Sequence, residues 1–145
     1  MLTRDNLKKR NCPGNPACSF CDQLETANHL FFGCSNAKVV WGTIGSVLGT
    51  GTCPTSLWQC VSWFHRFFAR GRKFHMLLIA ATCWAIWNIR NGITFEKKVV
   101  RSPIVTIFSM CAFLHFLAGL YSGEDRDRIK EGADQLMVRA SQLAA

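Results

Sequence analysis

Beyond residue 34, apolar residues recur every three or four positions, the spacing that places them on one face of a helix. This pattern predicts five helices, at residues 35–49, 56–68, 74–91, 102–120 and 124–143. The first 34 residues lack the period and contain the turn-forming stretch "CPGNP". We therefore expect a mainly α protein in which a small irregular segment precedes about five helices.

Capping residues support these boundaries. Ser35 is a predicted N-cap, Ser56 and Gln59 form a capping box, and Ser102–Pro103 begins the fourth helix. The expected core-facing residues are Ala37, Val40, Trp41, Ile44, Val47 and Leu48 in the first helix, Leu57, Cys60, Val61, Phe64 and Phe68 in the second, and Ile129, Ala133, Leu136, Met137, Ala140 and Leu143 in the last.

Two of the helical segments, residues 74–89 and 104–121, contain no formal charge. A membrane span needs about 20 apolar residues, with about 17 as the minimum, and polar residues dilute the second segment. We expect the two to form a buried antiparallel helix pair. Membrane association through residues 104–121 is the alternative.

The net charge of +8 is concentrated in two stretches of the chain. Residues 1–17 contain four basic residues and one acidic residue. Residues 56–101 contain eight basic residues and one acidic residue. Clustered positive charge attracts a polyanion such as nucleic acid, or an anionic membrane face. A solvated basic surface is the alternative interpretation.

Cysteine is abundant, with eight residues in a chain of 145. No apolar run follows the basic N-terminal residues, so we expect no secretory signal. Cys53, Cys60, Cys83 and Cys111 lie in apolar or helical surroundings, where a free thiol packs as a small hydrophobe. We expect a reducing compartment, the nucleus or cytoplasm, and no disulfide framework. A mitochondrial or other organelle membrane is the alternative.

Four potential metal ligands lie within seventeen residues: Cys18, Cys21, His29 and Cys34. A Cys-x2-Cys turn lets two thiolates reach one Zn²⁺ ion at about 2.3 Å, and tetrahedral S/N coordination is what zinc prefers. His29 and Cys34 are five positions apart and converge if a turn leads into a helix start there. With all four positions filled by protein, such a site is structural rather than catalytic. A chance pattern in a cysteine-rich chain is the alternative.

The residues around these ligands resemble a known family. "LTRDNLKKRN", "CSFCDQLETANHLFFGCSNAKVVW" and "CWAIWNIRNGITFE" are similar to the zinc-binding domain at the C-terminal end of plant LINE-type reverse transcriptases, which belong to non-LTR retrotransposons. The resemblance covers residues 2–96 and implies that Cys18, Cys21, His29 and Cys34 bind one Zn²⁺. We expect a zinc-binding module at residues 1–50, made of the zinc knuckle (the ligand segment at residues 18–34) and the first helix. We expect a helical region at 51–145 to pack on this module in one continuous domain.

Two features depart from the family pattern. The family domain has an aromatic-rich segment before "TRDNL", whereas this chain begins with Met1 just before it. We therefore expect part of the first packing layer to be missing or replaced. Cys12 stands where the family has a tryptophan. A spare thiol is the favoured interpretation of Cys12, and its nearness to the cluster makes it the one credible substitute ligand.

Residues typical of catalysis are absent from the sequence. A polymerase palm needs a Tyr-x-Asp-Asp-like metal site, and the only tyrosine lies in "YSGE". No spaced carboxylate cluster suits two-metal hydrolysis, and no serine stands in a nucleophile-elbow context. We expect no enzymatic activity.

These features together predict a non-catalytic zinc-binding protein that associates with single-stranded RNA or DNA. The residues predicted to contact nucleic acid are Arg4, Lys8, Lys9, Arg10, Phe20, Arg66, Arg70, Arg72 and Lys73. Phe31 and Phe32 are further candidates for base stacking, although burial against the first helix is the favoured interpretation for both. The alternative is a protein-interaction module whose exposed apolar helices bind another protein or self-associate.

Overall fold

The structure is a computed structural model that describes residues 2–50, 53–67, 72–100 and 102–144. Its elements are α1 (Arg4–Lys9), the π-helical turn η1 (His29–Gly33), α2 (Ser35–Leu48), α3 (Leu57–Phe67), α4 (Arg72–Phe95), α5 (Ile104–Ala118) and α6 (Gly123–Ala144). The only β pairing in these ranges is one antiparallel bridge between Ala17 and Leu24. The predicted mainly α fold, with five helices after an irregular segment, is confirmed.

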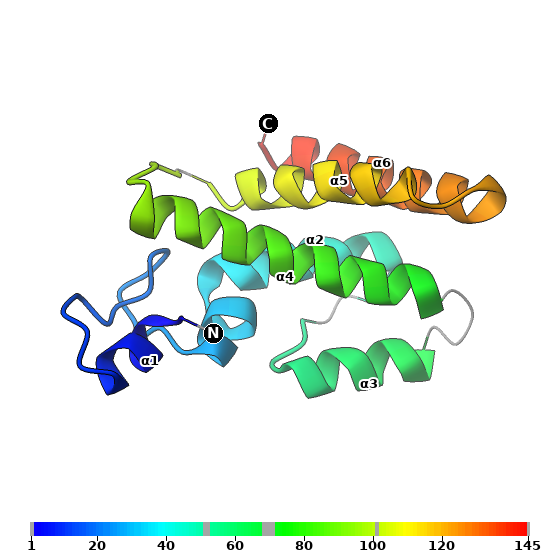
Figure 1. Cartoon of the computed structure of the whole chain (residues 1–145). Helices are drawn as coiled ribbons and strands as arrows, with labels where there is room; N and C mark the ends of the chain where they lie inside the picture. The colour runs from blue at the N-terminus through cyan, green and yellow to red at the C-terminus, as the bar shows by residue number, and fades with distance from the viewer. Residues whose placement is uncertain (1, 51–52, 68–71, 101, 145) are drawn as a thin grey trace.

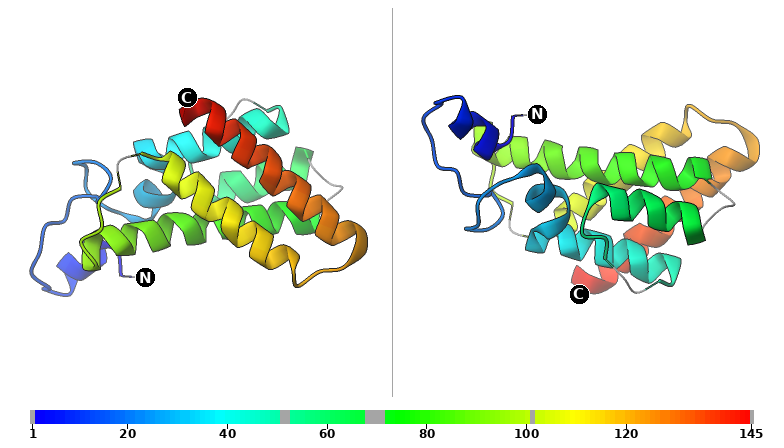
Figure 2. Two further views of the ribbon diagram at one scale, coloured as in Figure 1. Left: turned by 90° about the horizontal axis from the view of Figure 1, so that it is seen from above. Right: turned by 90° about the horizontal axis from the view of Figure 1, so that it is seen from below.

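The longest helix, α4, lies at the centre of the molecule (Figure 1). On one side it packs against α5, which in turn packs against α6. On the other side it contacts α3 and η1, and α2 joins η1 to α5 and α6. Viewed from above, α5 crosses α4 obliquely with α6 beside it (Figure 2).

The two uncharged segments form a helix pair, because α4 and α5 are in contact and run in opposite directions (Figure 1). The buried residues of α5 include Ile107, Met110 and Leu114, none of which is accessible to solvent. The expected antiparallel pairing is confirmed, but the expectation that the pair is buried is only partly right, because Trp84 and Phe116 are 41% and 67% exposed. Across the described ranges, no helix combines the length and apolar character that a membrane span requires.

Helix ends follow the predicted capping chemistry with small shifts. Cys34, not Ser35, is the N-cap of α2, and Gly49 ends that helix in the left-handed region at φ 76°. At the start of α3, the Gln59 N–H donates to the Ser56 hydroxyl at 3.1 Å. The Gln59 side chain accepts from the Thr55 N–H rather than from the Ser56 N–H that a capping box requires.

The expected core faces are largely confirmed. Buried residues include Ala37, Val40, Trp41 and Ile44 in α2, Cys60 in α3, and Ile129, Ala133, Leu136 and Ala140 in α6. Two expectations are wrong, since Leu57 and Leu143 are 53% and 48% exposed. Both lie in terminal turns, where a helix has neighbours on one side only. The Phe64 side chain and the whole of Phe68 lie outside the part of the chain that the structure describes.

A close approach between α4 and α6 depends on a glycine. A Cβ atom on Gly132 would lie 2.8 Å from Cε2 of Phe74 and closer still to its Cζ, so the Phe74 ring could not keep its present position against α6. By contrast, a Cβ on Gly42 in α2 would meet only the Cys53 sulfur, at an ordinary 3.6 Å.

We expect Gly132→Ala to destabilise the fold by about 1–3 kcal/mol through overpacking, although alanine is the better helix former. Gly42→Ala is the matched control and should be neutral or stabilising by up to about 1 kcal/mol. Urea unfolding of both variants measures the difference. Equal stability of the two variants would contradict the packing described between Phe74 and α6.

Candidate metal centre

Residues 16–25 form a short hairpin whose turn contains the first two candidate ligands. The Cys18 N–H donates to the Gln23 carbonyl at 2.7 Å, and the Glu25 N–H donates to the Pro16 carbonyl at 3.0 Å. Between these bonds the chain reverses, and the Phe20 N–H points at the Cys18 sulfur at 3.5 Å. The turn therefore brings Cys18 and Cys21 to one side and directs a backbone donor at a sulfur.

The π-helical turn η1 aligns the other two candidate ligands. The Cys34 N–H donates to the His29 carbonyl at 2.6 Å, which closes an i→i+5 turn. Residues five apart lie about 140° apart around an α-helix, and the wider π turn reduces that angle. Thr26 fixes the start of the turn, because its hydroxyl accepts from the His29 N–H at 3.0 Å. The expectation of a turn running into a helix start is confirmed, since α2 begins at Ser35.

The four side chains converge on one point. Their ligand atoms all lie within 4.8 Å of one another, with Cys18 and Cys34 buried and Cys21 and His29 half-buried. The Cys34 sulfur is 3.8 Å from each of the other two sulfurs. Two thiolates bound to one Zn²⁺ at about 2.3 Å in a tetrahedron are about 3.8 Å apart. The Nε2 atom of His29 is 3.1 Å from the Cys21 sulfur, so this nitrogen faces the cluster. The donor set and its spacing fit a zinc ion.

The hydrogen bond between Cys18 and Cys34 shifts the pKa values of the two thiols in opposite directions. The hydrogen bond with Cys34, together with burial, raises the pKa of the Cys18 thiol above its ordinary value. The same bond lowers the pKa of Cys34, as does a bond from the Asn36 backbone N–H. Cys18 therefore holds its proton while Cys34 is the readier thiolate. A zinc ion must displace such protons, so its binding weakens as pH falls.

A fully buried ion pair attaches the hairpin to α4. Both Glu25 and Arg90 have no solvent-exposed side-chain surface. Arg90 donates to the Glu25 carboxylate twice, at 2.6 and 3.2 Å. The carboxylate also accepts from the Arg4 N–H at 2.9 Å, and Arg90 donates to the Leu2 carbonyl at 3.2 Å. The pair thus joins residues 2–4, the hairpin and α4 at one point.

Arg4 takes part in the same junction rather than projecting freely. It is half-buried and donates to the Ser19 hydroxyl at 3.0 Å and to the Thr94 hydroxyl at 3.4 Å. Ser19 and Thr94 are themselves 2.8 Å apart. These contacts place α1 beside the C-terminal end of α4, as both figures of the ribbon show (Figures 1 and 2).

The other predicted nucleic-acid contacts are distributed unevenly. Lys8, Lys9 and Arg10 are exposed on or just after α1, and Phe20 is half-buried against the core. Phe31 and Phe32 are buried, as favoured, with Phe31 near the Trp87 ring and Phe32 stacked on Trp41. Arg70 lies outside the described residues, and so do the side chains of Arg66, Arg72 and Lys73.

Sequence reasoning missed a basic segment that follows α4. Lys97 and Lys98 are exposed, and the left-handed backbone at Lys97 (φ 55°) turns Lys98 back so that its N–H donates to the Gly92 carbonyl at 3.1 Å. We call Lys8, Lys9, Arg10, Lys97 and Lys98 the α1/α4 basic surface. Its two parts are nearly ninety residues apart in the sequence but lie at the same end of the folded molecule (Figures 1 and 2). Phe95, 61% exposed, lies beside them at the end of α4.

The remaining cysteines lie outside the cluster. Cys12 is exposed and is not among the four clustered ligands. Cys60 and Cys111 are buried and Cys83 is partly buried against the core, which confirms that they pack as small apolar side chains. This burial raises the pKa of Cys60 to about 12 and those of Cys83 and Cys111 to about 11. The expectation that Cys53 packs in the same way is wrong. Cys53 is exposed in the α2–α3 connection, with its sulfur 3.7 Å from the Lys38 carbonyl.

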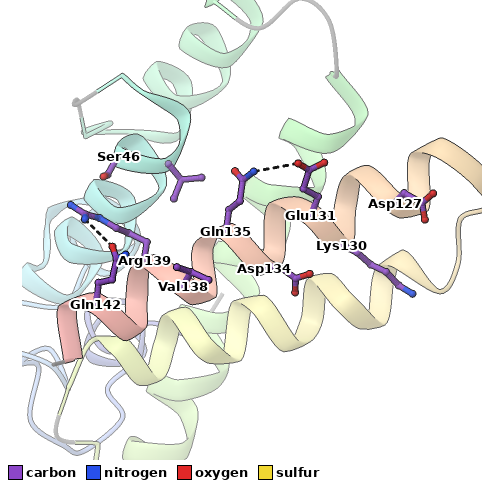
Figure 3. Close-up of a pocket in the computed structure, with 10 residues that line it drawn as sticks. Ser46, Asp127, Lys130, Glu131, Asp134, Gln135, Val138, Arg139 and Gln142 are labelled. Carbon is purple, nitrogen blue, oxygen red and sulfur yellow. Dashed lines mark hydrogen bonds between the residues drawn. The ribbon is translucent and has the colours of Figure 1, made fainter.

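A surface depression of about 850 Å³ lies along α6, away from the cysteines (Figure 3). Asp127, Glu131 and Asp134 alternate there with Lys130 and Arg139. Asp134 is held by His115 of α5, whose Nε2 is 2.9 Å from its carboxylate. Such a mixture of acidic and basic side chains is typical of a solvated helix face.

The comparison with protein families matches residues 1–41 to the family described as zinc-binding in reverse transcriptase. All four clustered ligands and Trp41 lie inside the match, and the expected extension to residue 96 lies outside it. Comparisons with curated proteins and with solved structures give no match. Residues 1–41, with their Cys18, Cys21, His29 and Cys34 cluster, are therefore similar to the zinc-binding domains of reverse transcriptases.

Proposed function

We propose that the chain is a non-catalytic, zinc-folded module, derived from a retrotransposon reverse transcriptase, that binds single-stranded nucleic acid. The observation that carries this proposal is the position of the α1/α4 basic surface beside the metal centre. Arg4 links the two, since its side chain bonds both to Ser19 in the knuckle and to Thr94 near the end of α4. A zinc ion at the cluster would therefore hold the basic surface in place.

Charge supports a polyanionic ligand. The α1/α4 basic surface contributes five positive charges, and two of them, both on exposed lysine side chains, have acidic partners. Lys9 is 3.9 Å from Asp5, and Lys98 is 2.7 Å from Glu96. Such exposed pairs are worth at most about 1 kcal/mol and can be exchanged for phosphate contacts. A surplus of positive charge therefore remains for the nucleic-acid backbone.

An exposed aromatic ring supports single strands over duplexes. Phe95 stands at the end of α4, and its ring centroid is 5.5 Å from the guanidinium of buried Arg90. One face of the ring is thus fixed against protein while much of the side chain is open. Base stacking on such rings is worth about 1–3 kcal/mol per base and is available only where bases are unpaired.

The cysteine chemistry supports a reducing compartment, the nucleus or cytoplasm. Zinc is held by thiolates, and all eight cysteines of the chain are free. Oxidation of the clustered sulfurs would remove the ligands and the fold of the knuckle together.

We expect the zinc-loaded chain to bind a fluorescent single-stranded oligonucleotide with an affinity that falls as salt rises. Lys97→Ala/Lys98→Ala should weaken binding and reduce the slope of log affinity against log salt by about 1–2. Phe95→Ala should weaken binding by about 1–3 kcal/mol, and Phe95→Tyr should retain it. Fluorescence anisotropy at several salt concentrations measures all three.

The matched control is Lys130→Ala, which removes one exposed charge from α6, far along the chain from the α1/α4 basic surface. It should leave the salt slope unchanged. Absence of binding at low salt would contradict the proposal. Because the control removes one charge and the Lys97/Lys98 variant removes two, equal effects per charge removed would show that binding follows net charge and not this surface.

A further inference from the structure

The outer face of α5 is apolar although it faces solvent. Val105, Phe108 and Phe116 are 43%, 38% and 67% exposed, and Ala112 between them is also exposed. These residues follow each other at intervals of three or four, so they form one stripe opposite the buried residues of the helix. A helix that is apolar all round is normally covered on all sides. Among the described residues, no segment covers the stripe (Figure 2).

The stripe continues onto α4 and past the end of α5. Phe113 stacks on Trp84 of α4 with 4.2 Å between ring centroids, and Phe116 stacks next to Phe113 at 6.2 Å. Trp84 is 41% exposed, Met76 two turns before it is 50% exposed, and Leu120 after α5 is 71% exposed. We call Met76, Trp84, Val105, Phe108, Ala112, Phe113, Phe116 and Leu120 the α4/α5 apolar face.

The chemistry of this face excludes a strongly charged partner. From Ile104 to Tyr121 the chain has no Asp, Glu, Lys or Arg. His115, the one side chain of α5 that can carry a positive charge, points toward α6, where it pairs with Asp134. A charged or phosphorylated ligand would find no counter-charge on this face, whereas a second apolar surface would lose no ion pairs by docking there.

We propose that the α4/α5 apolar face is the contact between two copies of this chain. The face exposes about 600 Å² of side-chain surface, with aromatic side chains at about 200 Å² each. That equals the largest apolar patches of ordinary monomers. Two copies would bury about 1,200 Å² in total, the lower limit for a specific stable interface, so the dimer dissociates in the micromolar range.

The order of residues along α5 makes the face complementary to itself. Ala112 lies midway between Phe108 and Phe116, one helical turn from each. When two α5 helices pack antiparallel about a two-fold axis at Ala112, Phe108 of each copy meets Phe116 of the other. The small alanine lets the helices approach, and the same aromatic pair forms on both sides of the axis, as an isologous interface requires.

The test is sedimentation of the zinc-loaded full chain from about 1 to 200 µM under reducing conditions, which exclude disulfide-linked dimers. The expected result is a monomer–dimer equilibrium that added salt preserves or tightens, because no ion pairs hold it. Phe116→Lys should remain monomeric throughout while its circular dichroism and zinc content are unchanged. The matched control, Val138→Lys, alters a residue of α6 that is 58% exposed and should dimerise as the unmodified chain does.

A chain that stays monomeric at the highest concentration overturns the proposal. So does equal loss of dimer in both lysine variants, since the contact would then not be specific to this face. A monomer that instead sediments with phosphatidylcholine vesicles would assign the face to a lipid surface. Loss of nucleic-acid binding leaves the result intact, because the α1/α4 basic surface is not part of the interface.

Discussion

Replacing Cys34 by serine is expected to abolish stoichiometric zinc binding and to unfold the N-terminal 34 residues. Cys34 is fully buried and its sulfur is 3.8 Å from both of the other clustered sulfurs, so no neighbouring group can take its place. A segment this rich in turns has too little apolar core to order itself. Metal binding at such sites contributes on the order of 10 kcal/mol to folding. Cys21→Ser and His29→Ala should have the same effect.

The change is measured as zinc per chain by atomic emission and as helix content by circular dichroism. The N-terminal segment should lose its structure first, while α4, α5 and α6 partly persist because they bury one another. Cys12→Ser is the matched control, since Cys12 is exposed and lies outside the cluster, and it should retain one zinc per chain. Loss of zinc from Cys12→Ser but not from Cys34→Ser would refute the ligand assignment.

Arg90→Met is expected to lower the free energy of unfolding by about 3–5 kcal/mol, because it leaves the buried Glu25 carboxylate without its counter-charge. Methionine matches the apolar stem of arginine, so the cost comes from the charge and not from a cavity. The Leu2 carbonyl also loses the hydrogen bond that the Arg90 guanidinium donates to it. Urea unfolding at a fixed zinc concentration measures the change.

The matched control is Glu96→Gln, which breaks the Glu96–Lys98 pair. The two pairs have nearly equal distances, 2.6 and 2.7 Å, but the control pair is exposed by 60% and 66%. Its loss should cost less than about 1 kcal/mol. The double variant Glu25→Leu/Arg90→Met should cost less than the sum of its single variants, since it leaves no unpaired buried charge. Additive losses would contradict a direct ion pair.

The pattern of apolar residues predicted the helices because each of them buries one face. The Cys/His spacing predicted the cluster for a similar reason, since zinc fixes both the type of ligand and its reach. The helix ends were less well predicted, as at Ser35, because one residue more or less in a helix changes little in packing. Leu57 and Leu143 show the same weakness at terminal turns.

The contacts between distant segments could not be read from periodicity. Arg90 is the one formal charge between residues 74 and 95, in a helix whose other charges are its first two residues, and this was a usable signal that it needs a buried partner. The sequence could not say that the partner is Glu25, because only the folded chain brings the two together. The same is true of Lys97 and Lys98, which only the fold brings to the end of the molecule that carries α1.

The apolar character of residues 104–121 allowed two interpretations at the sequence level, a core helix or a membrane segment. The fold supports the first for one side of α5, whose inner face is buried against α4 and α6. The outer face remains apolar and exposed, which composition alone could not reveal because it does not distinguish the two sides of a helix.

The most direct test of the metal centre is X-ray absorption at the zinc edge of the purified chain. We predict a first shell of three sulfurs at about 2.3 Å and one nitrogen at about 2.0 Å. Nearly the same spectrum should be obtained from Cys12→Ser. A shell of four sulfurs, or one dominated by oxygen and nitrogen, would contradict the assignment of Cys18, Cys21, His29 and Cys34 as the ligands of one zinc ion.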